Sequence, residues 1–509
     1  MIRIKYWKYT FAWVLSLLVI MSCDVLDEPL QNVELEEETD YTKSEDMVLL
    51  LYGAYGEFND LQWETFPTIS VRGDDVNAAG DQEPLTQTDE FKYDRNFWMY
   101  NSTWLNLYND IFLFNGLMES INFYKESGAN AAEADQYIAE IKVMRAFELL
   151  QIARLWGDIL VPATSVPAEL EDTPLSTFEE AMQHISDQMD EAISDLPPVR
   201  PNQRTDIQGG VTRYTAYAVK AMANLELKNY QKVADATGEI IGAGLFHLEP
   251  DFYQLFKIPG KLSDESLMEL QYSDFGTSSG TSTSYLWEFF GPGAYTPAVA
   301  GSGGGWGFWE PTVKYIKFML DRGEEERLVT SVIFTPDGIA EIQSDPEYAP
   351  LPAFISTTSP DGDQFENHTR YDFLSGKHYL PTVQLTPGRT KWGENNNFRV
   401  IRYAEVLLMH AEALVNGASS AVMSADDAVN EVRGRAGLGA ISGVTLDNVL
   451  DEKFAEFAME WGIRFYDLVR HGRTAELNHD GIIYEEGKDR FLPYPLEQVD
   501  ALPQLQDGN

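Results

Sequence analysis

Cysteine is almost absent from this sequence, because Cys23 is the only one among 509 residues. A single cysteine excludes an intramolecular disulfide framework and a zinc site built from several thiolates. The seven histidines form no H-E-x-x-H motif, and the sequence has neither a P-loop nor a G-x-G-x-x-G loop. Asp361-Gly362-Asp363 offers carboxylates but lacks the rest of an EF-hand, so this run is typical of a polar turn. We therefore expect neither a metal site nor a cofactor.

Positive charge is also scarce. The chain has 37 Lys and Arg residues against 81 Asp and Glu residues, which gives a net charge of −44. Nucleic-acid binding requires a basic surface, and the basic residues form no run, so we expect no nucleic-acid partner. The electric field of this net negative charge opposes the approach of strongly anionic ligands, although the charges of local loops can outweigh it. With 44% hydrophobic and 12% aromatic residues, the composition is that of a folded chain.

The N-terminus has the pattern of an export signal. Arg3, Lys5 and Lys8 precede an apolar stretch, residues 9–21, that is too short to span a bilayer comfortably. The stretch ends at Ile20-Met21-Ser22-Cys23, which resembles a bacterial lipobox. We expect a signal peptide over residues 1–22, an acylated acidic tether over 23–40 and a folded domain over 41–509, held to a membrane by lipid on Cys23. The alternative is an ordinary signal peptide with an incidental cysteine.

The C-terminal part predicts three successive amphipathic helices. Apolar residues recur at helical spacing over 400–415, over 425–436 and over 454–469. Gly437 followed by Leu438 is a plausible left-handed end for the second helix. Because each helix has an apolar face, the three must pack on one another.

Further helices are predicted upstream, over 46–58, 102–124 and 134–156, with residues 63–100 interpreted as a loop. Ser176-x-x-Glu179 resembles a capping box that opens another helix. The unit from 216 to 241, AYAVKAMANLELKNYQKVADATGEII, resembles a tetratricopeptide helix pair, and 411–436 resembles another. The predicted fold class is mostly α, with tetratricopeptide-like helix pairs as the scaffold and few short strands.

Between residues 258 and 397 the helical periodicity disappears, and only 312–321 has the pattern of a helix. Gly, Ser, Thr and Pro dominate this insert, but it is dense in aromatic residues, which argues against disorder. An irregular insert of this length inside a compact chain is typical of a functional segment.

Several motifs together resemble the SusD/RagB family. They are RYAEVLLMHAEA, DDAVNEVRGRAGL, EWGIRFYDLVRHG and FLPYPLEQ near the C-terminus, and IAEIKVMRAFELLQIARLWGDI upstream. The sequence departs from the family pattern at Trp461, at Tyr494 and at Leu502-Pro503, which bears on packing near the C-terminus.

The resemblance implies a lipid-anchored protein on the outer face of the outer membrane. Such proteins lie over a SusC-like TonB-dependent transporter, capture oligosaccharides or polysaccharide for uptake, and are usually not enzymes. A minority resemble peptide-binding relatives. Because of the net charge we favour a neutral glucan, α or β, as the ligand.

A glycan site needs flat aromatic faces for the C–H patches of a pyranose and polar side chains for its hydroxyl groups. We expect the platforms in the insert and in the loop over 63–100, while Trp104 and Trp461 lie on helical stripes and belong to the core. The polar candidates resemble a loop position where the family often places ligand contacts. The predicted ligand-binding residues are Trp287, Tyr295, Trp306, Trp309, Arg72, Asp74, Asp75, Asn77 and Trp98, and Trp63 and Trp392 are further aromatic candidates.

Other functions stay open at this point. The same architecture could bind peptides through main-chain hydrogen bonds. Gly276-Thr277-Ser278-Ser279-Gly280 matches the G-x-S-x-G of serine hydrolases, but TSTS is a poor helix start after it. A pair of carboxylates could make a glycosidase if a sugar-sized cleft separated them. A tetratricopeptide adaptor inside the cell would require that Cys23 is not lipidated.

Overall fold

The computed structural model describes residues 39–62, 65–276, 289–293, 295–296, 305–387 and 395–506, with only the backbone for Gln62, Tyr295 and Thr296. The predicted signal peptide, Cys23 and nearly all of the tether lie outside these residues. Within the described part of the chain, none of the helices is both long and apolar enough to cross a bilayer.

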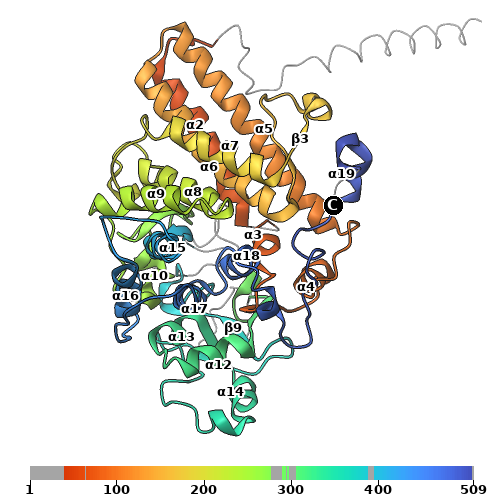
Figure 1. Ribbon diagram of the computed structural model, residues 1–509, viewed down its shortest axis with the longest axis vertical. Helices are drawn as coiled ribbons and strands as arrows, with labels where there is room; N and C mark the ends of the chain where they lie inside the picture. Colours follow the sequence, from red (N-terminus) through yellow and green to blue (C-terminus); the bar gives the residue numbers. More distant parts are fainter. Residues whose placement is uncertain are drawn as a thin grey trace, which may run out of the picture.

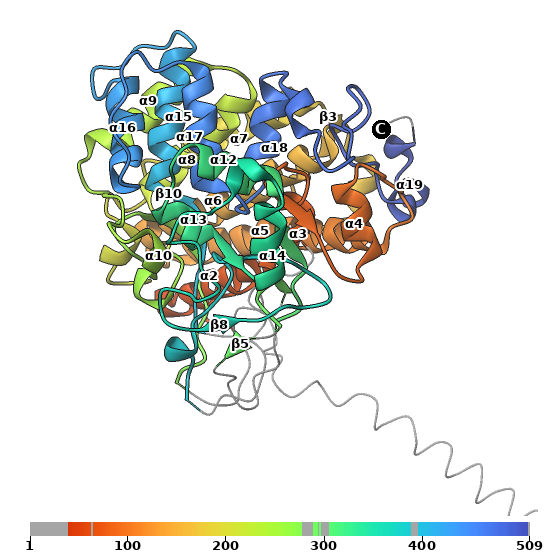
Figure 2. The ribbon, with the colours of Figure 1, turned by 90° about the horizontal axis from the view of Figure 1, so that it is seen from below.

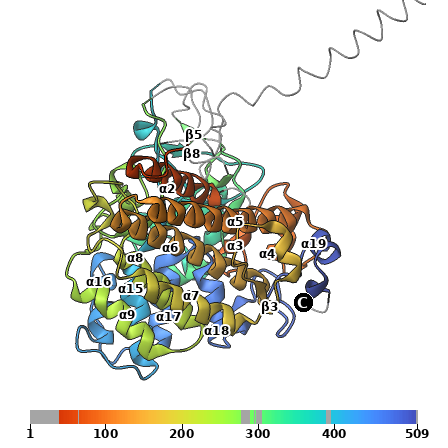
Figure 3. The same ribbon diagram turned by 90° about the horizontal axis from the view of Figure 1, so that it is seen from above.

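Helices packed in chain order form the scaffold (Figures 1 and 3). Each packs on the next, α15 also contacts α8, and α16 packs on α15 (Figure 2). The prediction of a mostly helical, tetratricopeptide-like scaffold is confirmed. The helices are α2 (Ser44–Phe58), α5 (Trp98–Ser127), α6 (Ala131–Trp156), α7 (Phe178–Ala192), α8 (Arg213–Glu226), α9 (Tyr230–Gly242), α15 (Tyr403–Val415) and α16 (Ala425–Arg435).

Local signals set several of these helix ends. Asn130 caps α6 by accepting from the backbone N–H groups of Ala132 and Glu133. Gly437 takes a φ of 74°, so the predicted left-handed end after α16 is present. The capping box of α7 is one residue later than predicted, because Thr177 and Glu180 make it and Ser176 belongs to strand β3. Trp104 and Trp461 are buried in the core, as predicted.

The structure differs from the prediction in two of the three C-terminal helices. Residues 398–402 form strand β10, which pairs antiparallel with β4 (Ser266–Leu270), so the helix begins at Tyr403. The predicted helix over 454–469 is two helices, α17 (Leu446–Phe457) and α18 (Ile463–Arg470). The break contains Met459 and Gly462 at positive φ, and a Cβ on Gly462 would lie 2.6 Å from the carbonyl oxygen of Ile69.

The insert contains more regular structure than the sequence predicts. Besides α12 (Val313–Asp321), which matches the prediction, it has α13 (Glu326–Ser331) and α14 (Pro336–Gln343). Five two-stranded antiparallel pairs complete the described sheet structure. The remaining strands are β1 (Val76–Ala78), β2 (Ile159–Leu160), β3 (Leu175–Ser176), β5 (Tyr295–Thr296), β6 (Trp309–Pro311), β7 (Val332–Phe334), β8 (Gln364–Phe365) and β9 (Phe373–Ser375).

The predicted loop over 63–100 is also partly regular. It holds β1 and the short helices α3 (Thr65–Ser70) and α4 (Glu83–Asp89), and α5 begins at Trp98. The other short helices are α10 (Phe252–Leu255) and α19 (Leu496–Ala501). These pieces are too short for a helical period to show in the sequence.

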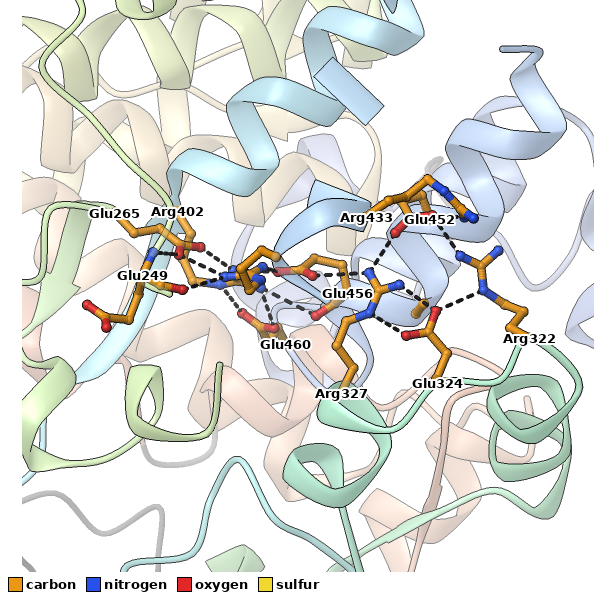
Figure 4. Close-up of polar contacts among 12 residues, drawn as sticks. Glu249, Glu265, Arg322, Glu324, Arg327, Arg402, Arg433, Glu452, Glu456 and Glu460 are labelled. Carbon is orange, nitrogen blue, oxygen red and sulfur yellow. Dashed lines mark hydrogen bonds and ion pairs between the residues drawn. The ribbon is translucent and has the colours of Figure 1, made fainter. Parts of the chain in front are cut away.

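A buried network of ion pairs joins the insert to the helical scaffold (Figure 4). The guanidinium of Arg402 lies 2.6 Å from Glu265 and 2.9 Å from both Glu456 and Glu460. Arg327 of α13 contacts Glu456 at 3.2 Å. Arg402 belongs to β10, Arg327 to α13 and Glu456 to α17, while Glu265 directly precedes β4 and Glu460 follows α17. The network therefore fixes four segments relative to one another. Glu324, Arg435, Glu452 and Lys377 extend it.

Candidate ligand-binding site

The structure brings the first long loop and the insert together through the pairing of β1 with β6. Asn77 faces Glu310 and Ala78 faces Trp309 in this antiparallel pair. The ladder continues where the N–H of Ala79 donates to the carbonyl oxygen of Phe308 at 2.7 Å. The two loop regions predicted to hold the ligand platforms are therefore neighbours in space.

Segment 305–308 is held on its other side by residues 289–293. The N–H groups of Gly305 and Phe308 donate to the carbonyl oxygens of Pro292 and Phe289, at 2.8 and 2.9 Å. Gly307 has a φ of 60°, and a Cβ there would lie 2.5 Å from the ring of Tyr371. Only glycine fits this close approach without strain. We call the surface formed by residues 77–81, 289–293, 305–309 and 368–371 the loop junction.

Trp306 provides an aromatic face at the loop junction. Its side chain is partly exposed, and its ring is set edge-on to Phe289 and Phe308 at centroid distances of 5.4 and 5.6 Å. These contacts fix the indole plane, which is what a stacking platform for a sugar ring requires.

Polar groups lie next to this ring. One Nη of Arg370 donates to the carbonyl oxygen of Trp306 at 3.4 Å, and the other lies 3.5 Å from the carboxylate of Asp81. Asp81 keeps 68% of its side chain exposed, so the pair is open to solvent. The ring of His368 stacks on Tyr371 at 4.5 Å. An exposed ring, a carboxylate and a guanidinium side by side match the chemistry that a neutral saccharide needs.

The sequence did not single out Asp81, His368, Arg370 or Tyr371. The run His-Thr-Arg-Tyr at 368–371 combines aromatic and polar side chains, and this composition is the signal that could have found it. Its proximity to Trp306 depends on contacts between distant parts of the chain.

Three predicted polar contacts are corrected because their side chains are buried in the fold. Asp74 pairs with Arg464 at 2.7 Å and Lys314 at 2.6 Å. Burial opposes ionisation of Asp74, but these two cations hold its pKa below the ordinary value. Asp75 accepts from the N–H of Met459, and burial raises its pKa to about 6. The guanidinium of Arg72 lies 4.2 Å from the ring centroid of Phe465 and donates to the Tyr466 hydroxyl.

The prediction that Trp309 contacts the ligand is also wrong, because this residue is buried. Its ring is fully buried, with Phe290 at a centroid distance of 4.2 Å and Phe66 at 5.1 Å. A ring with no exposed face cannot stack on a ligand, so Trp309 belongs to the core beneath the loop junction.

The remaining predicted ligand-binding residues are partly buried, exposed on α5, or outside the described residues. Asn77 is partly buried, and its side chain bonds to Asp480 at 3.3 Å and to His479 at 3.0 Å. Trp98 begins α5 with 51% of its surface exposed and stays a prediction. Trp287, the side chain of Tyr295, Trp63, Trp392 and Ser278 lie outside the described residues.

A cavity of about 670 Å³ lies beside the loop junction, between residues 90–93 and 480–493. Phe91, Tyr93 and Phe491 line it, and Asp480 connects it to Asn77. Phe91 and Asp480 both have positive φ, at 56° and 47°, which is uncommon for residues other than glycine. The volume is in the range of pockets that hold small molecules.

Comparisons with known proteins agree with this architecture. The family model described as the SusD family matches residues 264–497. The chain is 26% identical to SusD-like protein P2 of Formosa agariphila, with 99% of each chain covered. It is 22% identical to a SusD-like protein of Bacteroides ovatus over 85% of this chain and 76% of that protein.

Solved structures share the fold at low sequence identity. Surface glycan-binding protein A from Bacteroides thetaiotaomicron, in complex with laminarihexaose, superposes with a TM-score of 0.72 at 22% identity, covering 91% of this chain and 99% of that one. A laminarin-binding SusD-like protein gives 0.75 at 20% identity, covering 91% and 98%. The helical scaffold and the C-terminal motifs agree with these matches, and residues 264–497 match the SusD family.

Proposed function

We propose that the protein is a non-catalytic, surface-anchored glycan-binding protein that captures oligosaccharides at the loop junction. The observation that carries this proposal is Trp306, a partly exposed ring held by Phe289 and Phe308 beside the open Arg370–Asp81 pair. A neutral glucan fits best, because the net charge of −44 opposes anionic polysaccharides and because two relatives of the same fold are named for binding laminarihexaose or laminarin.

The test is calorimetric titration of the chain without its signal peptide against laminarihexaose, maltohexaose and a sulfated polysaccharide. We expect saturable binding of a neutral oligosaccharide, and at least a tenfold loss of affinity in Trp306→Ala. Trp306→Phe is the matched control, because it keeps an aromatic face and should retain most of the affinity. Binding that is unchanged in Trp306→Ala would remove the loop junction as the site.

Absence of turnover is part of the proposal. Product release should be followed by chromatography in the same samples. Released sugar that disappears in Ser278→Ala would make the protein a serine hydrolase instead. Saturable binding of peptides in place of glycans would favour the peptide-binding alternative.

We also propose that residues 1–22 are removed, that Cys23 is acylated and that residues 23–40 tether the domain to the outer membrane. The bound glycan would then pass to a SusC-like TonB-dependent transporter. Labelling of cells with an alkyne fatty acid should mark the wild type and not Cys23→Ala. Surface exposure predicts that added protease degrades the protein on intact cells, and protection of the protein would contradict it. Co-purification with a TonB-dependent transporter is the corresponding test of the partner.

A further inference from the structure

A separate pocket of about 250 Å³ lies within the insert, between α13–β7 and residues 354–360. We call it the insert pocket. Aromatic rings form much of its wall, namely Tyr253, Phe334, Phe354, Phe365 and Tyr379. Ser356, Thr358 and Ser359 add three hydroxyl groups on one side. Among the described residues that line the pocket, Glu325 carries the only formal charge, so the lining suits an uncharged ligand.

The Tyr253 hydroxyl lines the insert pocket, is buried and forms no hydrogen bond of good geometry. Its polar neighbours are the Ser359 hydroxyl and the carboxylate of Asp361, which lies outside the lining. Buried polar groups without partners are rare in folded proteins, because each loses its hydrogen bonds to water. Burial raises the pKa of the Tyr253 phenol, and the Asp361 carboxylate raises it further, so the phenol keeps its proton and can donate.

The size of the pocket argues against a single bridging water as the missing partner. At about 30 Å³ per molecule in the liquid, the space corresponds to about eight waters. It is slightly smaller than the pockets of drug-sized ligands, which start at about 300 Å³. One sugar ring is an occupant of the right size, with C–H faces for the aromatic wall and hydroxyl groups for the Tyr253 hydroxyl.

The walls of the pocket are fixed by buried contacts. The ammonium group of Lys257 donates to the carbonyl oxygens of Gly376 and Tyr379, at 2.7 and 2.5 Å. Asp363 accepts from the Tyr379 hydroxyl and from the N–H of Thr382. A site that is already ordered loses little entropy when a small ligand binds.

The insert pocket is connected to the rest of the insert through strand pairing. Phe365, one of its wall residues, belongs to β8, which pairs with β5. The lining does not include Trp306 or Arg370, so the pocket and the loop junction are separate surfaces.

We propose that the insert pocket binds a single uncharged sugar ring, as a second saccharide site distinct from the loop junction. The inference rests on the proposed function in one respect, namely that the ligands of this chain are saccharides. Tyr253 donates to a ring hydroxyl, and the aromatic wall contacts the C–H face.

The test uses methyl β-D-glucopyranoside as the probe and saturation-transfer NMR on the full chain. Three variants are compared with the wild type. Tyr253→Phe removes the hydroxyl and keeps the ring, Val329→Phe fills the pocket from α13, and Trp306→Ala alters the loop junction alone. We expect at least a threefold weaker affinity for the probe in Tyr253→Phe, no transfer in Val329→Phe and unchanged transfer in Trp306→Ala.

Each outcome decides between the two proposals. If laminarihexaose binds through Trp306 while the glucoside gives no transfer, or gives equal transfer in all variants, the insert pocket is overturned and the proposed function stands. If the glucoside binds through Tyr253 while no oligosaccharide depends on Trp306, the pocket stands and the loop junction fails. A crystal soaked with the glucoside that shows only water in the pocket would also overturn the inference. Circular dichroism and thermal unfolding check that each variant is folded.

Discussion

Arg402 at the end of β10 lies 2.9 Å from Glu456 in α17, and both side chains are buried. Arg327 and Arg435 contact the same carboxylate. Burial alone would raise the pKa of Glu456, but the arginines outweigh it and hold that pKa far below the ordinary value. Glu456 is therefore an anion on which three cations from separate parts of the chain converge.

Removing this charge should be strongly destabilising. We expect Glu456→Gln to lower the free energy of unfolding by about 3–5 kcal/mol, because it removes one buried counter-charge that three buried guanidinium groups share. Urea unfolding at pH 7 measures the change. The folded pKa lies below the unfolded one, so this contribution is present above about pH 4.5 and is lost as the pH falls.

Glu485→Gln is the matched control, since Glu485 and its partner Lys488 are both largely exposed. Exposed pairs contribute little, so this variant should unfold like the wild type. Equal effects of the two substitutions would show that the buried network does not stabilise the fold.

The stability should also depend on pH through Asp110 on α5. Burial raises its pKa to about 8, helped by Glu57 and Asp60. Buried Glu148, with both carboxylate oxygens unpaired, lies near enough to interact with it. A carboxyl with a raised folded pKa contributes stability that is complete below about pH 4 and is lost as the pH rises towards 8. Asp110→Asn should therefore gain stability relative to the wild type over this range.

Unfolding of the wild type and Asp110→Asn at pH 4, 6 and 8 measures that difference. Glu126→Gln, on the exposed side of the same helix, makes the same change in charge without burial. A difference for Asp110→Asn that stays constant with pH, or one matched by Glu126→Gln, would contradict the prediction.

The ring of Phe308 lies so close to Gly80 that we expect this position to accept no side chain. Gly80 has a φ of 88°, and a Cβ there would lie 2.6 Å from Phe308. We expect Gly80→Ala to displace Phe308, which supports Trp306, and so to lower both the melting temperature and the affinity for glycan.

Gly53→Ala serves as the comparison. Gly53 is helical, and its Cβ position has no atom within 4 Å, so alanine should stabilise α2 by about 0.5–1 kcal/mol. A Gly80→Ala variant that matched Gly53→Ala in stability and affinity would mean that the loop junction tolerates the displacement.

The position of the capping box predicts that alanine substitutions at Thr177 and at Ser176 affect stability differently. Thr177→Ala should lower the free energy of unfolding by about 1 kcal/mol, because Thr177 accepts from the N–H of Glu180. Ser176→Ala should have little effect, since Ser176 is the end of β3. Denaturant unfolding measures the loss of unfolding free energy in both variants. A larger loss for Ser176→Ala than for Thr177→Ala would show that Thr177 is not the cap of α7.

Local patterns predicted the helical scaffold because the apolar faces of α6, α8 and α9 repeat within a few residues. Local patterns gave the wrong structure where contacts between distant segments determine it. Val400 lies on a helical stripe in the sequence, yet it belongs to a strand because β4 pairs with its segment. Gly462 interrupts the helix predicted over 454–469 because the backbone of Ile69 approaches it closely.

The candidate site was predictable to a smaller extent. Trp306 and Trp309 are alike in the sequence, but the packing of Phe66 and Phe290 on Trp309 leaves only Trp306 with exposed surface. The sequence around Asp74 predicts a ligand contact, but in the folded chain Asp74 forms ion pairs with Arg464 and Lys314. Such partners lie hundreds of residues away, so no local pattern reveals them.

The pairing of Ala78 with Trp309 has a consequence for the order of folding. The two strands lie far apart along the chain, and closing so long a loop costs entropy that only later contacts offset. During synthesis the first strand must wait without a partner until the ribosome has released Pro311. The helices between the two strands can form beforehand, so the loop junction assembles after α5 to α9.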